Sequence, residues 1–294
     1  MTARIIRAFT SQASWWFIAP SLLVLAIFLS GYFLLVKASL LHPLPGRFDG
    51  EGPLTLDNFE RFLRTPSEWR VLLQTLKVSA GLTIAAILIG FPVSFAIVRA
   101  QTALRRFLIA AFVLTLLSGT VTRAYAWLII LGNKGVINGT LIRLGIIDSP
   151  IPMIYSNVAV SISLVHYILP FFVLTLIGAL KNVPRALEES AVSLGASRLS
   201  AFWHVTLPLS LPGIVASSAL SFSIAVSSFI FPLLLGGGRV RFVSNEIYDL
   251  IFVNFDLPMA ATSAFIFLLT SLCAVWLFST LQRFAGGRLH RQAH

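Results

Sequence analysis

Six long runs of apolar residues alternate with shorter polar stretches along the 294-residue chain. Each run is long enough to cross a hydrocarbon layer of about 30 Å as an α-helix. None of them shows the two-residue alternation of apolar and polar positions that marks a membrane β-barrel. Only helices and closed barrels satisfy their backbone hydrogen bonds in lipid, so the pattern predicts an all-α membrane protein with six transmembrane helices. The predicted spans are Trp15–Val36, Leu76–Val98, Phe107–Leu131, Val158–Leu180, Ile214–Leu235 and Ala260–Leu281.

The first run follows Arg4 and Arg7 and could be mistaken for a secretory signal peptide. Its apolar part is longer than the core of about 7–15 residues that signal peptides have, and no small-x-small cleavage site follows closely. We therefore expect it to be a retained span.

Charge decides the expected orientation of these spans. Charged residues make up only 11% of the chain, against roughly a quarter in soluble domains, and the formal net charge is +11. If the spans alternate in direction, one side holds the two termini and the basic residues named below, while the loops of the other side are longer and hold fewer basic residues per residue. The positive-inside rule makes the first side cytoplasmic, with both termini there. The excess charge then sets the topology, and nucleic-acid binding is not expected. The residues on that side are Arg4, Arg7, Arg99, Arg105, Arg106, Lys181, Arg185, Arg198, Arg283, Arg288 and Arg291.

The chain shows no tandem repeat and no low-complexity tract, which favours a single domain. We expect this domain to cover residues 15–282, between a basic cytoplasmic start (1–14) and a basic cytoplasmic tail (283–294). The single cysteine, Cys273, lies in the last span and excludes an intrachain disulfide and a cysteine-based metal site.

Several kinds of chemistry are missing from the sequence. No G-x-x-x-x-G-K-[ST] motif is present, and Gly236–Gly238 is followed by Arg-Val-Arg in an external loop, so nucleotide binding by this chain is not expected. No Asp or Glu lies inside a span, which argues against ion-coupled carriers and intramembrane aspartyl proteases. His166 has no nucleophile motif beside it and is better explained by helix packing than by catalysis. We expect a polytopic protein that is not an enzyme and binds no cofactor or metal.

One polar segment, Arg185–Pro212, interrupts the apolar pattern on the predicted cytoplasmic side. Pro184 suits a helix start, and Glu188 and Glu189 in the first turns complement the helix dipole. Gly195 can end this helix with a positive φ, and Ser197 can cap a second short helix that Pro208 ends before a new span starts at Pro212-Gly213. The pair could pack on its own bundle or dock a partner from the water phase, and the residues alone leave both open.

The spacing within this segment carries a resemblance to a known family. Glu189-Ser190-Ala191, Gly195 and Val205-x-Leu207-Pro208 resemble the EAA motif of permease subunits of binding-protein-dependent ABC importers, with Ser190 and Val205 as departures. Further stretches resemble the spermidine/putrescine-type branch, and the likeness covers nearly the whole chain. These stretches are Arg123–Trp127, Gly132–Asn138, His166–Pro170, Pro232–Gly237 and Ile247–Tyr248.

The resemblance implies a type I importer domain in the bacterial inner membrane, with a coupling loop at 184–208. It implies three partners: an ATPase subunit that binds ATP and Mg, a second, similar permease subunit, and an extracytoplasmic solute-binding protein. In this picture Glu189 contacts the ATPase, Gly195 is the turn between the helices, and Leu194 with Phe202 forms an apolar plug. The full set of expected coupling residues is Glu188, Glu189, Ala191, Leu194, Gly195, Phe202, Leu207 and Pro208.

The solute is less determined than the architecture. A polyamine would be stabilised by carboxylates or aromatic rings along the path, yet Ser227-Ser228 and Pro232-Leu233 stand where we expect acids in polyamine permeases. A polyamine-like or other small nitrogenous compound is the leading expectation; thiamine, ferric ion, phosphonate or an amino-acid derivative, and a non-transporting scaffold or signalling subunit, are the alternatives. The expected path residues are Tyr125, Trp127, His166, Ser223, Ser227 and Ser228, with close helix packing as the competing explanation for the serines.

Overall fold

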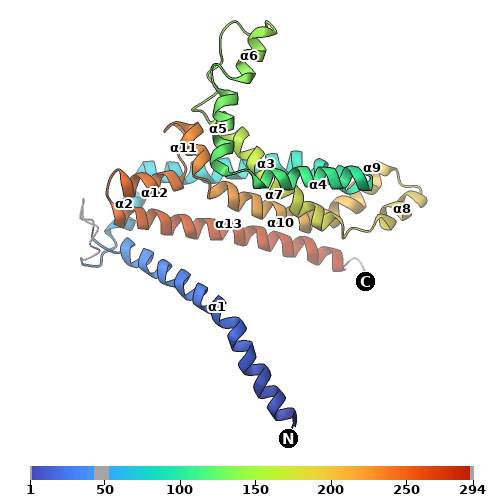
Figure 1. Cartoon of the computed structure of the whole chain (residues 1–294), viewed down its shortest axis with the longest axis horizontal. Coiled ribbons are helices and arrows are strands. Elements are labelled where there is room, and N and C mark those ends of the chain that lie inside the picture. Colours follow the sequence, from blue (N-terminus) through green and yellow to red (C-terminus); the bar gives the residue numbers. More distant parts are fainter. Residues whose placement is uncertain (1, 43–52, 292–294) are drawn as a thin grey trace. The chain divides into compact units, whose positions relative to one another are not determined.

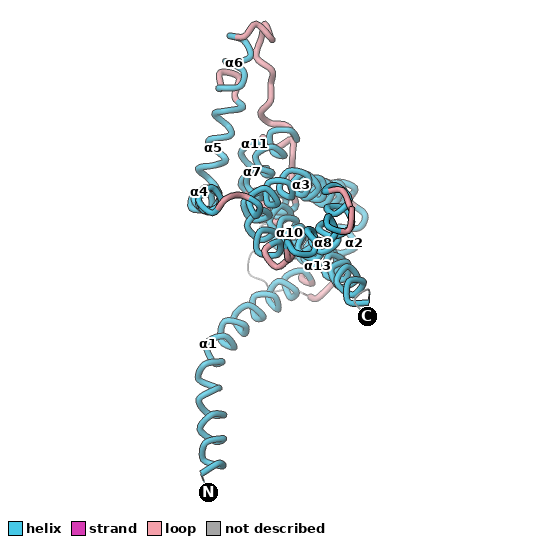
Figure 2. Tube along the Cα trace, turned by 90° about the vertical axis from the view of Figure 1, so that its right-hand side faces the viewer, coloured by secondary structure: helices cyan, strands magenta, loops and turns pink. Residues whose placement is uncertain are grey.

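The computed structural model describes residues 2–42 and 53–291, with side chains for 19–42 and 53–280. The described residues form helices joined by loops, with one isolated antiparallel bridge between Leu41 and Leu54 (Figures 1 and 2). The helices are α1 (Thr2–Ser39), α2 (Asp57–Arg64), α3 (Pro66–Arg99), α4 (Thr102–Leu117), α5 (Thr120–Leu131), α6 (Val136–Arg143), α7 (Asn157–Leu180), α8 (Arg185–Ser193), α9 (Arg198–Ala201), α10 (Leu207–Val226), α11 (Ile230–Gly236), α12 (Val243–Phe252) and α13 (Leu257–Arg291).

The prediction of an all-α protein with six spans is confirmed, with changed boundaries. Five helical stretches of the described chain are long and apolar enough to cross a membrane, and a bent pair makes a sixth. The helices begin and end outside several predicted limits: α1 starts at Thr2 and α3 at Pro66, where the hydropathy placed Trp15 and Leu76.

The third predicted span, Phe107–Leu131, is not one straight helix. It breaks at Ser118 and Gly119 between α4 and α5, and the two arms are bent by 97° (Figure 1). Ser118 and Gly119 both have extended ψ angles, so the α-helical ladder stops there although the hydropathy continues. Figure 2 shows the same change of direction from a second side, with α4 seen nearly end-on and α5 leading away from it.

The fifth predicted span, Ile214–Leu235, also has different limits. Helix α10 ends at Val226, and the short helix α11 starts only at Ile230. At the other end, the prediction that Pro208 ends one helix and Pro212 starts another is wrong. A π-helical turn at Phe202–Thr206 joins α9 to α10, so helical backbone runs from Arg198 to Val226.

The chain divides into two compact units, residues 1–68 with 247–266 and residues 69–246 with 267–294. In the first unit, the buried Asn58 of α2 donates hydrogen bonds to the carbonyl oxygens of Ser39 and Leu41, at 3.0 and 2.7 Å. Arg61 of the same helix forms an ion pair with Asp256 at 2.6 Å. These contacts connect α2 to the end of α1 and to the loop before α13.

The second unit is built around α7. This helix packs against α10, α11, α5 and α4, and its buried side chains include Leu164, Ile168, Phe172 and Leu176. The contact with α10 is so close that a Cβ atom on Gly213 would lie only 2.4 Å from the Cβ of Ala179. Small residues at such a position let two membrane helices approach until their backbones nearly touch. The end of α7, just before α8, is therefore packed tightly against α10.

Candidate functional site

The first candidate region is the coupling segment, defined as residues 184–208. Helix α8 starts after Pro184 and ends at Ser193, with Gly195 at φ +93°. The N–H of Gly195 donates to the carbonyl of Val192, and the N–H of Ala196 to that of Ala191, at 2.9 and 3.0 Å. These two bonds form a Schellman motif, which closes a helix when the residue after the cap is left-handed. The predicted turn at Gly195 is confirmed.

The start of the next helix is also as predicted. The Ser197 Oγ accepts a hydrogen bond from the N–H of Ser200 at 3.1 Å and caps α9. Helix α9 then passes into the π turn, in which the N–H of Leu207 donates to the carbonyl of Phe202. Pro208 has no N–H, so the carbonyl of His204 lacks its α-helical donor, and the π turn lies directly before this point. Leu207 and Pro208 are therefore partly buried residues of a continuous helix rather than of a loop.

The two glutamates of the segment lie in different surroundings. Glu188 forms an ion pair with Arg99 at the end of α3, and it accepts a hydrogen bond from the Thr206 hydroxyl at 3.1 Å. Glu189 is exposed, and its carboxylate has no hydrogen-bond partner among the described residues. Glu188 thus attaches α8 to the rest of the chain, while Glu189 stays available on the outside.

Phe202 strengthens the same attachment. Its ring contacts Phe91 and Phe95 of α3 edge-on, at centroid distances of 6.0 and 5.4 Å. Arg99, the partner of Glu188, lies over the Phe95 ring at 4.9 Å. We call the set Phe95, Arg99, Glu188, Phe202 and Thr206 the α3–α8 clamp. Sequence reasoning placed Phe202 on an outward plug beside Leu194, whereas its ring lies against α3.

The outer face of the segment is apolar as well as acidic. Leu194 is 90% exposed, and Leu187 and Leu199 are exposed too, while Ala191 is partly covered. A helix pair that is held from inside and shows leucines and a free carboxylate outside has the composition of a protein-docking surface. The residues that sequence reasoning missed are Arg99, Phe95 and Thr206. They lie far from α8 in the sequence, and no local pattern links them to it.

The second candidate region is the expected solute path. The Trp127 indole N–H donates to His166 Nδ1 at 3.3 Å, and the two rings meet edge-on at 5.6 Å, so α5 and α7 bring these two residues together. Tyr125 on α5 is half exposed. Four residues before Trp127, the buried Arg123 of α5 lies over the Tyr167 ring at 5.4 Å.

The three path serines lie where α10 ends. Ser223 and Ser227 donate to the carbonyls of Ala219 and Ser223, each at 2.8 Å, and the carbonyl of Ser228 accepts from Ser244 at 2.7 Å. Ser227 is exposed, whereas Ser228 is buried. Their hydroxyl contacts are mostly with their own helix, which is how serines in membrane helices satisfy their donors. The break in the helix at Ser227 and Ser228 is a feature that the sequence pattern did not reveal.

Residues 126–285 match the family model described as "Binding-protein-dependent transport system inner membrane component". The spermidine/putrescine transport system permease protein PotB of Haemophilus influenzae is 34% identical over 226 residues, which is 77% of this chain and 78% of that protein. PotB of Escherichia coli strain K12 is 33% identical over 211 residues, or 71% of this chain and 76% of that one.

The fold has a solved counterpart. A bacterial ABC transporter involved in the import of the acidic polysaccharide alginate has a chain that superimposes with a TM-score of 0.73 at 18% identity, covering 94% of this chain and 98% of that one. An identity this low speaks for the fold alone. The family match and the identity to PotB together show that this chain belongs to the binding-protein-dependent transport system inner membrane components, the multi-pass permease subunits of ABC importers.

Proposed function

We propose that the coupling segment receives the movement of a separate ATP-hydrolysing subunit and passes it to α7 and α10. The observation that carries this proposal is the difference in surroundings between the two glutamates. Glu188 ties α8 to α3 and to Thr206, so a force on α8 reaches the spans, while Glu189 and Leu194 remain on the outside for a partner. ATP and Mg would be bound by that partner and not by this chain.

We propose that the solute is a polyamine or another small nitrogenous compound. The supporting observations are the identity to two permeases named for spermidine and putrescine, and the aromatic pair that Trp127 forms with His166. Aromatic faces attract ammonium groups by about 0.5–2 kcal/mol each, so a cation can be stabilised without a carboxylate. Tyr125, Trp127 and His166 would contact the solute, with Ser223, Ser227 and Ser228 at the broken end of α10.

A second permease subunit and an extracytoplasmic binding protein would complete the transporter. The Ala19–Ser39 part of α1 is long and apolar enough to cross a membrane, and its surface would face lipid or another subunit. One solved relative of the same fold is an alginate transporter in complex with its ligand-bound periplasmic protein. In the proposed orientation both termini and the coupling segment face the cytoplasm of a bacterial cell.

Two measurements test the two parts of this proposal separately. Ligand screening of the cognate binding protein by thermal shift should show stabilisation by spermidine or putrescine; stabilisation only by thiamine, ferric ion, phosphonate or an amino-acid derivative would reassign the solute. Uptake of the identified solute into vesicles that contain the assembled complex should require ATP on the side of the coupling segment. ATP-independent uptake at the same rate would contradict the coupling role.

A further inference from the structure

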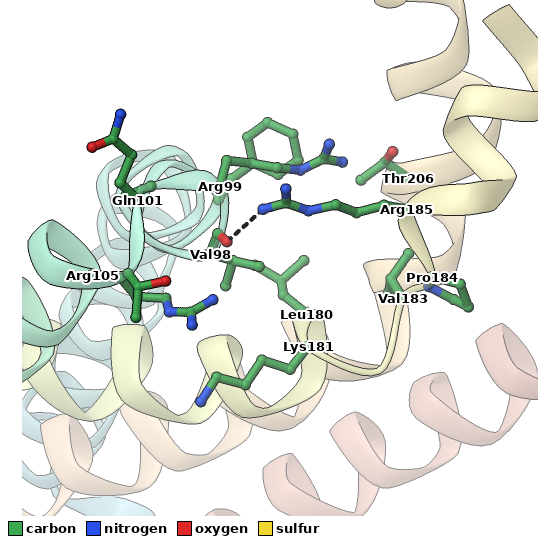
Figure 3. Close-up of a pocket in the computed structure, with 13 residues that line it drawn as sticks. Val98, Arg99, Gln101, Arg105, Leu180, Lys181, Val183, Pro184, Arg185 and Thr206 are labelled. Carbon is green, nitrogen blue, oxygen red and sulfur yellow. Dashed lines mark hydrogen bonds between the residues drawn. The ribbon is translucent and has the colours of Figure 1, made fainter.

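A cavity of about 550 Å³ lies where α3, α4, α7 and α8 meet (Figure 3). Its wall is formed by the last residues of α3 and α7, the first residues of α4 and the first residue of α8. A volume of this size is typical of pockets that bind small molecules. Pro184, Arg185 and Thr206 of the coupling segment contribute to its lining, whereas Glu189 and Leu194 do not.

The charge of the cavity is strongly positive. Arg99, Arg105, Lys181 and Arg185 all line it, and none of the thirteen lining residues is acidic. Arg99 is the one cation of the four that has a carboxylate partner among the described residues, Glu188. Arg185 donates to the carbonyl of Val98 at 3.0 Å, as Figure 3 shows, which leaves its charge uncompensated. Three uncompensated cations around one cavity repel one another, so an anion between them would be stabilising.

Helix α4 adds a second attraction for an anion. It starts at Thr102 with Gln101 as its cap residue, and both residues line the cavity. The cap makes no side-chain hydrogen bond, and the first turn holds no acidic residue, so the first backbone N–H groups of this 16-residue helix lack a capping partner from its own start. Free N–H groups and the positive end of the helix dipole bind anions, and phosphate groups in particular.

The position of the cavity indicates where the anion comes from. Two long apolar helices, α3 and α7, end at its wall with Arg99 and Leu180, and the apolar helix α4 begins there. Chain ends of transmembrane helices lie at the level of the lipid headgroups. Basic pockets between such helix ends bind the phosphate groups of anionic lipids.

From these observations we propose that the cavity is a binding site for a phosphate-bearing anion, the headgroup of an anionic phospholipid. The phosphate lies between Arg105, Lys181 and Arg185, close to the start of α4. Because Arg185 is the first residue of α8 and Lys181 directly follows α7, the bound headgroup connects α4 to the base of the coupling segment. The lipid therefore holds the base of α8 beside the α3–α8 clamp, whose residues Phe95, Arg99 and Thr206 also line the cavity.

The test uses the full chain, purified in detergent and freed of lipid. Binding is measured by native mass spectrometry during titration with phosphatidylglycerol, phosphatidylcholine or inorganic phosphate. We expect the double variant Arg105→Gln/Lys181→Gln to bind phosphatidylglycerol roughly 30-fold more weakly, since each cation near a membrane surface contributes about a fivefold gain in affinity. Arg106→Gln is the matched control, because Arg106 is the neighbouring cation, is exposed and does not line the cavity.

Each outcome decides the proposal. Loss of phosphatidylglycerol binding in the double variant, with binding kept by Arg106→Gln and by the charge-preserving Arg105→Lys, supports the lipid site. Binding of inorganic phosphate that depends on the same two residues, without phosphatidylglycerol binding, keeps the phosphate site but assigns it to a soluble source. The proposal is overturned if all variants bind phosphatidylglycerol and phosphatidylcholine equally well. It is also overturned if the unchanged protein binds neither phosphatidylglycerol nor inorganic phosphate.

A second readout separates this site from a merely structural role. ATP hydrolysis by the assembled complex is measured in nanodiscs of pure phosphatidylcholine and in discs that contain phosphatidylglycerol. The unchanged protein and Arg106→Gln should respond to phosphatidylglycerol, and the double variant should not. A double variant that melts at the unchanged temperature and still responds to the anionic lipid would contradict the proposal.

Discussion

Two neighbouring regions of the second unit, the α7–α10 contact and the coupling segment, each depend on a glycine for a different reason. At Gly213 a Cβ atom would lie 2.4 Å from Ala179, so the contact requires the missing side chain. At Gly195 no heavy atom lies within 4 Å of the same position, but φ is +93°. The core contact is thus set by volume, whereas the coupling segment is set by backbone conformation and a few directional bonds.

This difference suits the work of the two regions. Close packing leaves α7 and α10 little room to move independently, because protein interiors do not deform continuously. The coupling segment contacts α3 through the α3–α8 clamp and the Arg185–Val98 hydrogen bond, and Glu189 and Leu194 stay exposed. We therefore expect the coupling segment to be most sensitive to changes in the clamp residues, and the α7–α10 contact to be most sensitive to changes in side-chain volume.

The largest effect is expected for Gly213→Val. The added side chain overlaps with Ala179 in a packed contact, and we expect the protein to lose about 3 kcal/mol of stability. Thermal unfolding of the purified chain measures the change. The matched control is Gly178→Ala on α7, where no heavy atom lies within 4 Å of the new Cβ, and which should not lower the stability. Equal melting temperatures for both variants would show that the close approach does not constrain the helices.

The next effect concerns the α3–α8 clamp. Arg99→Gln, Glu188→Gln and the double variant form a double-mutant cycle, in which we expect a coupling energy of about 2 kcal/mol because both groups are partly buried and charged. Hydrogen exchange of the α8 amides reports the loss. The control pair is Arg64 and Glu60 on α2, whose side chains are 79% and 57% exposed and should couple by less than about 0.5 kcal/mol. Similar coupling energies for the two pairs would show that the Arg99–Glu188 ion pair does not hold α8 in place.

Glu189→Lys should affect assembly and leave the chain itself intact. Glu189 is exposed, so the melting temperature should stay within the range of about 0.5 kcal/mol that surface changes cause. Binding of the ATPase subunit should weaken about tenfold, through a repulsive contact at the interface. Copurification and solute-stimulated ATP hydrolysis measure this. Asp148→Lys reverses another exposed acid, in the α6–α7 loop, and should leave both unchanged.

The smallest effect is expected for Gly195→Ala. A left-handed residue with a Cβ costs about 1 kcal/mol, and nothing else opposes the methyl group. Hydrogen exchange near the end of α8 should rise while global unfolding stays the same. Gly195→Asn should be milder, because Asn adopts the left-handed conformation more readily. Gly139→Ala, in helix α6 without a positive φ, is the control; a change of the same size there would mean that the backbone angle at Gly195 is not the cause.

Part of this architecture could be read from local patterns. The lengths of the apolar runs predicted six spans, since each needs only enough residues to cross the membrane. The turn at Gly195 and the cap at Ser197 followed from the preferences of single residues at helix ends. The spacing from Glu189 to Pro208 predicted the family. All these features depend on residues that are close in the sequence, and the structure confirms the spans, the turn and the cap.

The breaks inside the spans could not be predicted in the same way. The pair of helices on either side of Gly119 passes the hydropathy test for one span, so hydropathy alone marks neither the bend of 97° nor the end of α10 at Val226. Pro208 was expected to end a helix by the usual rule, yet the helical backbone continues through it after a π turn at Phe202–Thr206. Whether a helix continues at such a residue depends on the packing around it.

The sequence by itself determined that the chain spans a membrane, which residues form the coupling segment, and that Glu188 and Glu189 are neighbours in it. The tertiary structure alone decided that these two acids have different surroundings, because it brings Arg99, 89 residues away, to Glu188 and leaves Glu189 exposed. It likewise gathered Arg99, Arg105, Lys181 and Arg185 around one cavity. Charges act over a few ångströms of space and not over sequence separation, so only the folded chain could show which of them meet.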